Sequence, residues 1–489
     1  MASSLHLGAT QQPVSWRGAL LALPLGFLLA LITVLYPLPG MLLGCGLGGV
    51  LLLSKQPHLL ILAFIFSLAI PIQKSLGGLP LNAADGLLVL GCLLWPFMLQ
   101  RDQAPSLERR RVPIVVWAIL PFLAATSLAQ VGSIAQGSSL KQLLRLVEWF
   151  VLLPVLLLVF RPDPRFWRFA ALSMLLVPCL FALDGLYELA TRGSRLTGML
   201  GIPVPIPEGG DAQIRHTFDI SGRAGSTFGG AQGLAMYLVM TMSVAIAHLF
   251  HSRQSWLRLL AGLCLLVCLG GLAAAQSRGG LLGALALLCV MLVMLRPGLL
   301  RWLVLLAVFG VLAGVLTLTL LPNWDGTLAD LVPGRPEAVL DRLIIWGVVF
   351  EVFQENPLFG VGLGNFRDAF FARDVLLNVE LGYPSLHAHN TYLEILAGTG
   401  LLGLLGYLGF LLLVARELLR RWRSRRGDEA AVFTLAALGT LAAYMVFAMV
   451  DMLLLQNMHL LLVLVLSLGL SDSRADAVGL KAPVGESTP

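Results

Sequence analysis

The sequence predicts an all-α membrane protein with about 12–14 transmembrane helices and one large, partly helical loop on one side of the membrane. The chain is 57% apolar and only 12% charged, which is far too apolar for a soluble protein of 489 residues. Apolar runs of about 18–22 residues recur along it, the length that a helix needs to cross the hydrocarbon core. Basic residues gather in alternate short loops, as the positive-inside rule requires of such proteins.

About fourteen apolar segments can be marked. They cover roughly 18–37, 40–54, 58–72, 84–100, 113–130, 143–160, 166–189, 228–250, 257–275, 279–296, 299–321, 391–415, 430–450 and 454–470. The first two pairs are short and rich in proline, so twelve or thirteen true spans also fit the pattern.

Charge orients these segments. With the N-terminus in the cytoplasm, most of the 33 basic residues fall in short cytoplasmic loops, and the reverse orientation would invert the rule at each of them. Both termini are therefore expected to be cytoplasmic. Three longer polar stretches then lie outside: about 190–227, the junction near Gln276–Gly280, and about 322–390. Long ordered loops of this kind often carry function.

The domain organisation follows from these assignments. We expect N-terminal helices with a shorter external loop, central helices with Arg278 at their external mouth, a large external loop, C-terminal helices and a cytoplasmic tail. Their predicted boundaries are 1–227, 228–321, 322–390, 391–470 and 471–489. Inside the large loop, Pro336 to Asn356 is predicted to be a helix that lies on the membrane surface or caps the bundle, because it is too apolar for a free surface helix.

Composition also excludes some partners. The net charge of +6 could suggest nucleic acid, but basic cytoplasmic loops explain it, so no nucleic-acid partner is expected. The six cysteines all lie in apolar runs without disulfide or metal spacing and are expected to be small core residues.

Three arginines on the external side stand in settings that suggest phosphate binding. Arg278 follows Gln-Ser at the mouth of a helix, Arg223 precedes another helix, and Arg342 lies one turn before Trp346 on the loop helix. The guanidinium group is always charged, and its planar fork matches phosphate oxygens. Each arginine alone could instead cap a helix or extend its side chain so that the charge reaches the membrane–water interface. Their convergence on one membrane face favours binding for Arg278 most and for Arg223 and Arg342 less.

Two histidines stand on the same face, where the large loop enters a helix. His387 and His389 are two residues apart and so do not share a helical face. A metal site would be expected to have further ligands nearby in the sequence, so no metal is predicted. A neutral histidine can act as a general base near neutral pH, while the alternative for His389 is that it only caps the following helix.

These residues carry a resemblance. His389-Asn390, nine further residues and then Gly400-Leu-Leu-Gly403 resemble the His-Asn-x9-Gly-x-x-Gly motif of the O-antigen ligase and O-antigen polymerase superfamily, although Leu404 stands where the motif often has Thr or Val. Three further pieces stand in the family's order: Ser277-Arg278-Gly279, Asp341-Arg342-Leu-Ile-Ile-Trp346, and the run from Asn356 to Phe366 that contains Gly360-Val-Gly-Leu-Gly364. That glycine run faces the outside, where nucleotides are scarce, so it is expected to be a flexible or tight turn.

The resemblance implies an inverting glycosyltransferase of the bacterial inner membrane that needs no cofactor and no metal. The donor would be a glycan on undecaprenyl diphosphate, the acceptor a hydroxyl of lipid A-core or another glycan, and the active site periplasmic. By position, His389 would be the base, Arg278 and Arg342 the diphosphate ligands, and Arg223 a softer match. His387 and Asn390 would support them, and Asn390 would cap the helix or orient His389.

The sequence leaves the particular reaction open. The large loop favours a ligase slightly over a polymerase of repeat units or an enzyme that glycosylates proteins. A transporter of lipid-linked sugars is disfavoured, because the sequence shows no obvious internal repeat and its polar residues gather on one face.

Overall fold

The structure is a computed structural model. It describes residues 58–68, 73–76, 79–99, 112–160, 164–199, 222–228, 230–296, 298, 336–373, 386–425, 431–453 and 458–471. The chain divides into two compact units, Met1–Leu59 and Leu60–Pro489. Nearly all described residues belong to the second unit.

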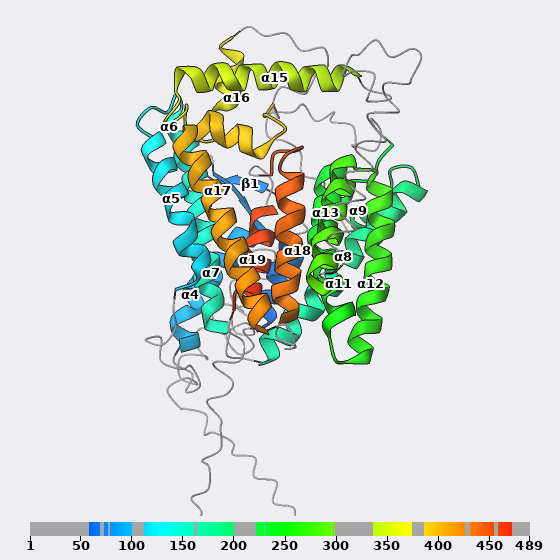
Figure 1. The fold of residues 1–489 in the computed structure, drawn as a ribbon. Helices are drawn as coiled ribbons and strands as arrows, with labels where there is room; N and C mark the ends of the chain where they lie inside the picture. The colour runs from blue at the N-terminus through cyan, green and yellow to red at the C-terminus, as the bar shows by residue number, and fades with distance from the viewer. Residues whose placement is uncertain are drawn as a thin grey trace, which may run out of the picture. The chain divides into compact units, whose positions relative to one another are not determined.

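Most of the described residues are helical (Figure 1). The longer helices are α3 (His58–Leu68), α4 (Ala83–Leu99), α5 (Ile114–Ala129), α6 (Gln136–Val147), α7 (Leu153–Phe160), α8 (Pro164–Ala190), α11 (Ala231–His251), α12 (Ser255–Ala275), α13 (Arg278–Leu295), α15 (Pro336–Glu355), α17 (Thr391–Arg425), α18 (Ala431–Phe447) and α19 (Met458–Gly469). Within the described part, α8, α11, α12, α13 and α17 are long and apolar enough to cross a membrane, and α5, α18 and α19 are shorter apolar helices. The predicted class, a helical membrane protein with many spans, is confirmed.

Each predicted segment that can be compared contains a helix of the structure, although some boundaries differ. The segments 18–37, 40–54 and 299–321, most of the tail 471–489, and parts of both external loops lie outside the described residues. The total of 12–14 spans therefore stays a prediction.

Three local features differ from the predicted pattern. A small antiparallel hairpin, β1 (Gln73–Leu76) and β2 (Leu79–Asn82), pairs Gln73 with Asn82 just before α4. The segment predicted at 143–160 begins seven residues earlier as α6 and passes through a π-helical turn, η2 (Glu148–Leu152), into α7. Finally, α17 continues ten residues beyond the predicted 415, because its last turns are rich in arginine, which favours helix.

Helix α11 forms the centre of one group of helices. Its buried residues face in every direction, because α8, α12, α13 and α18 all pack around it. A second group contains α4, α5, α7 and α17, and α18 with α19 lies between the two groups in Figure 1. A buried hydrogen-bond chain links this middle layer to α17: the hydroxyls of Tyr407 and Tyr444 bond to each other, and Tyr444 Oη lies 2.8 Å from His459 Nε2.

Helix α17 is broken at Gly400, and a loop fills the break. Gly400 has φ 64° and ψ −165°, which interrupts the helical hydrogen bonds. The segment that follows α15 replaces them: Val361 N–H donates to Ala397 O at 3.0 Å, and Gly362 N–H donates to Gly398 O at 2.8 Å. A Cβ on Gly400 would lie 2.3 Å from the carbonyl carbon of Leu358, so the approach requires glycine.

The run Gly360-Val-Gly-Leu-Gly364 is therefore a tight turn that docks into α17. All three of its glycines have positive φ, at 65°, 96° and 84°. Asn365, which ends the turn, donates from Nδ2 to Ser133 Oγ at 2.8 Å and so fastens it to the connection between α5 and α6. Of the two predicted alternatives, a flexible or a tight turn, the structure shows the tight turn, and its docking into a helix break explains why glycine recurs on both segments.

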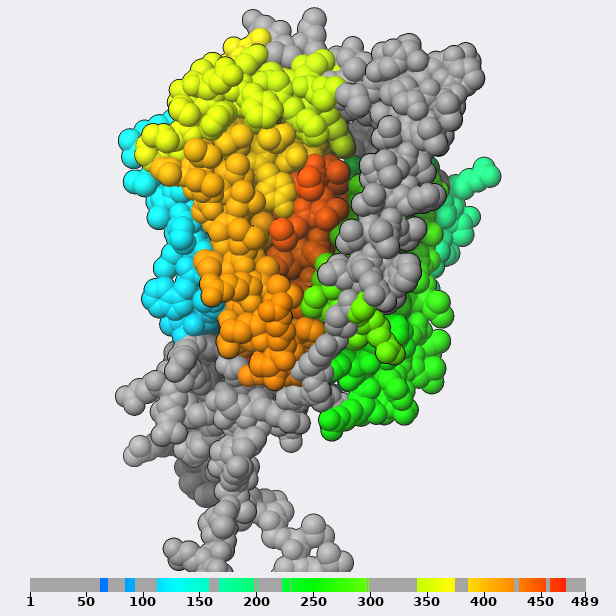
Figure 2. All heavy atoms as spheres, viewed as in Figure 1, coloured from blue at the N-terminus to red at the C-terminus, as the bar shows by residue number. Residues whose placement is uncertain are grey.

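Helix α15 caps this end of the bundle, which is one of the two positions predicted for it. It packs against α17 and the short helix α16 (Phe366–Phe371), and Figure 2 shows it in yellow, resting on the orange start of α17. Its buried face joins one apolar cluster with the docked turn and the loop before α17. The cluster contains Ile345, Val348, Val349, Val352, Val361, Phe366, Ala369, Phe370, Leu386, Ala388 and Ala397.

Candidate active site

The candidate site forms where the start of α17 meets the turn after α18. Thr391, the first residue of α17, donates its N–H to Ala448 O at 2.8 Å and its hydroxyl to Asp451 O at 2.9 Å. The same hydroxyl accepts the N–H of Leu453 at 2.9 Å. These three bonds fix the turn 448–453 against the loop that carries both histidines.

The backbone between the two histidines is held from both sides. The N–H of Ala388 donates to Glu394 Oε2 at 2.9 Å, and its carbonyl accepts the indole N–H of Trp346 at 2.8 Å. Glu394 lies on the first turn of α17 and Trp346 on the capping helix α15. His387 and His389, which flank Ala388, are thus positioned by two separate helices.

His389 itself has a left-handed backbone, with φ 49°. This conformation is uncommon outside glycine and is often found where function requires a strained geometry. The next residue, Asn390, caps α17: its Oδ1 accepts the N–H groups of Tyr392 at 2.9 Å and Leu393 at 3.1 Å. Its Nδ2 donates to Met449 O at 3.0 Å, which adds a further link to the turn after α18.

Both histidine rings face one carboxylate, Asp451. Asp451 Oδ1 lies 3.5 Å from His387 Nε2 and 3.8 Å from His389 Nδ1, and the two ring centroids are 4.1 Å apart. Asp451 is almost completely buried, whereas 19% of the His389 side chain stays exposed. A substrate can therefore reach His389 while Asp451 stays behind it.

Asp451 was not found from the sequence. It stands one residue past a predicted span, 62 positions after His389, and nothing local distinguishes it from a residue that ends a helix. The available signal was topological: an acidic residue at the end of the span 430–450 lies on the same membrane face as the histidines.

The protonation states suit proton transfer. Burial lowers the pKa of His389 below its usual range, and the nearby charges of His387 and Arg342 lower it further, while Asp451 works against this. Burial alone would raise the pKa of Asp451, but its interactions with His387 and His389 outweigh burial and hold that pKa below the usual range. Near neutral pH we therefore expect an ionised Asp451 beside a neutral His389. Because Nδ1 of His389 faces Asp451, Nε2 is the nitrogen that can accept a proton.

The predicted arginines lie at the same end of the bundle. They differ in how closely each is linked to His389. Arg342 is the nearest in effect, since its charge acts on His389. Arg278 begins α13, and Gly279 beside it packs against Phe447 and Val450, at the end of α18 just before Asp451. Arg223 is linked to this region through α12. The N–H of its neighbour Ala224 donates to Ala274 O at 3.1 Å, near the end of α12, and Arg278 follows that end.

The two histidines and Asp451 could also hold a metal ion. One ligand atom from each residue lies within 4.8 Å of the others. Two imidazoles and a carboxylate are a known set for zinc. The prediction that catalysis needs no metal is therefore a point for experiment.

A histidine backed by a carboxylate, with arginines at the same end of a helical membrane bundle, forms a set of groups suited to a charged, lipid-linked substrate. A family model described as O-antigen ligase matches residues 263–408, and through this region the chain is similar to the O-antigen ligase superfamily. The comparison with curated proteins gives no match. The matched region contains Arg278, Arg342, His389 and the docked break at Gly400. This similarity and the apolar helices indicate a bacterial membrane protein, and the matched family implies an enzyme of the glycosyltransferase or ligase type that acts on lipid-linked glycans.

Proposed function

We propose that the protein is an inverting, metal-independent glycosyltransferase. It moves a glycan from undecaprenyl diphosphate to an acceptor hydroxyl on the periplasmic face of the inner membrane. The favoured acceptor is lipid A-core, which would make the protein an O-antigen ligase. The observation that carries the proposal is the geometry of His389: an accessible imidazole backed by the Asp451 carboxylate, inside the region that matches the family model.

The step transfers one proton and exchanges one bond at the sugar. Nε2 of His389 takes the proton of the acceptor hydroxyl, and the oxygen attacks the anomeric carbon from the side opposite the diphosphate. The bond from that carbon to the diphosphate oxygen breaks, and its electron pair leaves with undecaprenyl diphosphate. One displacement inverts the anomeric configuration. General-base assistance of this kind is typically worth about 10²–10⁴ in rate.

Asp451 supports this step without touching the substrate. It faces Nδ1 of His389, which favours the tautomer that leaves Nε2 unprotonated, and its charge stabilises the imidazolium that forms. Arg342 and Arg278, with Arg223 as a further contributor, bind the diphosphate and stabilise the charge that grows on the leaving group. Losing one such electrostatic group typically costs about 10²–10³ in rate.

The direct test is reconstitution with a lipid-linked donor. Purified protein is mixed with undecaprenyl-diphosphate-linked glycan and, in separate reactions, with lipid A-core or with a second copy of the donor. A covalent glycan on lipid A-core supports the ligase, whereas longer chains on the lipid carrier would assign the protein to the polymerases. Movement of unmodified donor across a vesicle, with no new bond formed, contradicts an enzyme.

Two histidine variants test the site within that assay. His389→Ala is expected to abolish transfer while insertion and folding stay intact. His251→Ala is the matched control, because His251 ends α11 at the opposite end of the helix from the junction near Arg223. Normal transfer by His389→Ala would overturn the assignment of the base.

A further inference from the structure

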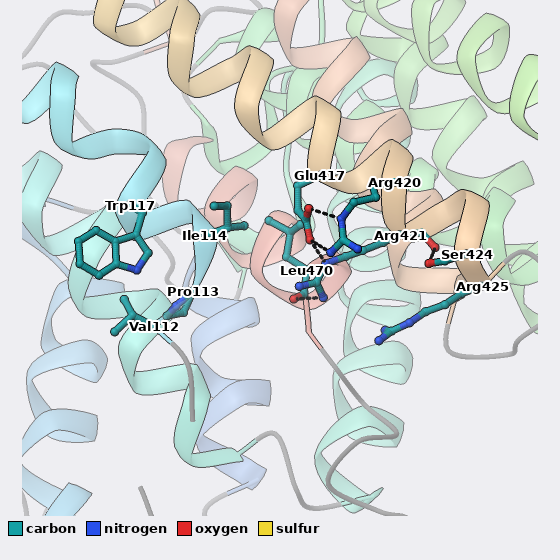
Figure 3. A pocket seen from close by; sticks show the side chains of 10 residues that line it. All are labelled: Val112, Pro113, Ile114, Trp117, Glu417, Arg420, Arg421, Ser424, Arg425 and Leu470. Atoms are coloured by element: carbon teal, nitrogen blue, oxygen red, sulfur yellow. Dashed lines mark hydrogen bonds and ion pairs between the residues drawn. The ribbon is translucent and has the colours of Figure 1, made fainter. Parts of the chain in front are cut away.

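A second site lies between the start of α5 and the end of α17. It is a pocket of about 300 Å³, shown in Figure 3. One wall is apolar and comes from the first turns of α5, including Ile114 and Trp117. The facing wall comes from the last turns of α17 and carries three arginines, Arg420, Arg421 and Arg425.

The arginines in this pocket are held in place. The single carboxylate in its lining, Glu417, accepts bonds from Arg420 Nε at 2.7 Å and Nη2 at 2.6 Å, and from Arg421 Nε at 2.7 Å. Arg421 also donates from Nη1 to Leu470 O at 2.5 Å, next to the end of α19. Among the described residues of the lining, three guanidinium groups stand beside one carboxylate, and the bonds of Arg420 and Arg421 to Glu417 orient their guanidinium planes before an anion binds.

The pocket stands at the level where lipid headgroups are found. Its arginines lie about 20–25 residues beyond the break at Gly400, or roughly 30–38 Å of helix, which is about the thickness of the hydrocarbon core. The pocket and His389 therefore lie at opposite membrane faces. Trp117 is 59% exposed, as expected of a tryptophan at a membrane interface. The sequence also places Arg109, Arg110 and Arg111 directly before Val112, in the stretch that precedes α5.

We propose that this pocket binds the phosphate group of an anionic phospholipid in the leaflet opposite the active site. The arginines take the phosphate oxygens, and the acyl chains run along the apolar wall at Trp117. A free phosphate would make no use of that wall. Basic residues that only follow the positive-inside rule would reach for water separately, whereas here Glu417 and Leu470 O direct two of them into one pocket. This site is independent of the proposed glycan transfer.

The test compares two charge-matched double variants in lipid nanodiscs. Arg420→Gln with Arg425→Gln removes two arginines of the pocket. Arg416→Gln with Arg423→Gln removes two exposed arginines from the same end of α17, outside the pocket lining. The bound phosphatidylglycerol is counted by mass spectrometry while its fraction is raised in a phosphatidylcholine background. Each arginine near a charged headgroup contributes about a fivefold factor, so the pocket pair should weaken binding about 25-fold.

The control pair should weaken binding by no more than about fivefold. An equal loss in both pairs would mean unspecific attraction of anionic lipid and would overturn the proposal, and so would normal binding by the pocket pair. Inorganic phosphate provides the other arm. If inorganic phosphate, at a millimolar concentration equal to that of phosphatidylglycerol, displaces the lipid completely, the pocket recognises phosphate alone and the lipid assignment is wrong.

A second measurement leaves the arginines intact. Phosphatidylglycerol with brominated acyl chains quenches tryptophans that its chains touch. The difference in quenching between the wild type and Trp117→Phe reports on Trp117 alone. It should be larger with brominated phosphatidylglycerol than with brominated phosphatidylcholine, and equal quenching by the two lipids would contradict a specific site.

Discussion

Basic side chains stand at both ends of helix α17, but their environments differ. The environment at the first end suits proton transfer, and the environment at the other end suits the binding of an anionic lipid. At the first end, His389 has a left-handed backbone, and a buried carboxylate stands behind it. At the other end, Arg420 is 67% exposed and pairs with Glu417 three residues away on a regular helix. The first end holds a group that can gain and lose a proton, whereas the second holds groups that stay charged. Variants at the two ends can therefore test this contrast.

The largest effect is expected at His389. Replacing it with glutamine keeps a polar side chain but removes the base, so transfer should fall by about 10²–10⁴. The double variant Arg420→Gln with Arg425→Gln, at the other end of the same helix, should keep its transfer rate. Initial rates of glycan transfer to lipid A-core measure both. If the arginine variant lost as much as the histidine variant, the two ends would not be separable.

The next effect is expected at the diphosphate ligands. Arg278→Lys and Arg342→Lys keep the charge but lose the planar fork, and turnover of the donor should fall by about 10²-fold if the fork contacts the diphosphate. Arg416→Lys, on the far end of α17, is the matched control. Turnover near the wild-type level in both site variants would show that phosphate is not bound in a bidentate manner there.

Replacing Asp451 should change both the rate of transfer and its dependence on pH. Asp451→Asn removes the orienting charge and should lower transfer by about 10–100-fold. Because Asp451 raises the pKa of His389 against the effect of burial, its loss should lower that pKa further. The wild type should stay active below about pH 6.5, the usual histidine pKa, and lose activity only as more acid protonates His389. In Asp451→Asn this acid limb should move to still lower pH.

A shift of the acid limb in the other direction would mean that Asp451 does not act on His389. An unchanged limb with a lower rate would show that Asp451 only supports the fold of the turn 448–453. The pH profile therefore distinguishes a positioning residue from a purely structural one.

The contrast between the two ends also shows what the sequence could predict. Apolar runs specify helices locally, so most described spans and the capping helix α15 were predicted to within a few residues, whereas the start of α6 and the end of α17 differ by seven and ten residues. Asn390 followed in the same way, from the preference of asparagine at helix starts. Asp451, Glu394 and Trp346 could not be assigned, because their roles rest on contacts with the histidine loop that only the packed helices create. The same holds for Gly400: its motif was visible, but the need for glycine comes from the backbone of Leu358, 42 positions earlier. The hairpin at 73–82 was missed because strands of four residues are too short to show alternation.

The smallest effect is expected at His387. Its Nε2 lies closer to Asp451 than His389 does, yet its neighbour carries the family motif, so His387→Ala should lower transfer by about tenfold or less. A chelator should leave the wild-type rate unchanged. If instead His387→Ala lost as much activity as His389→Ala, and a chelator abolished transfer that zinc restored, the three side chains would be metal ligands. His389 could not then use the nitrogen that faces Asp451 to hold its tautomer, and the base would have to be sought in a metal-bound water. The His387 variant and the chelator together thus decide whether Asp451 orients a base or completes a metal site.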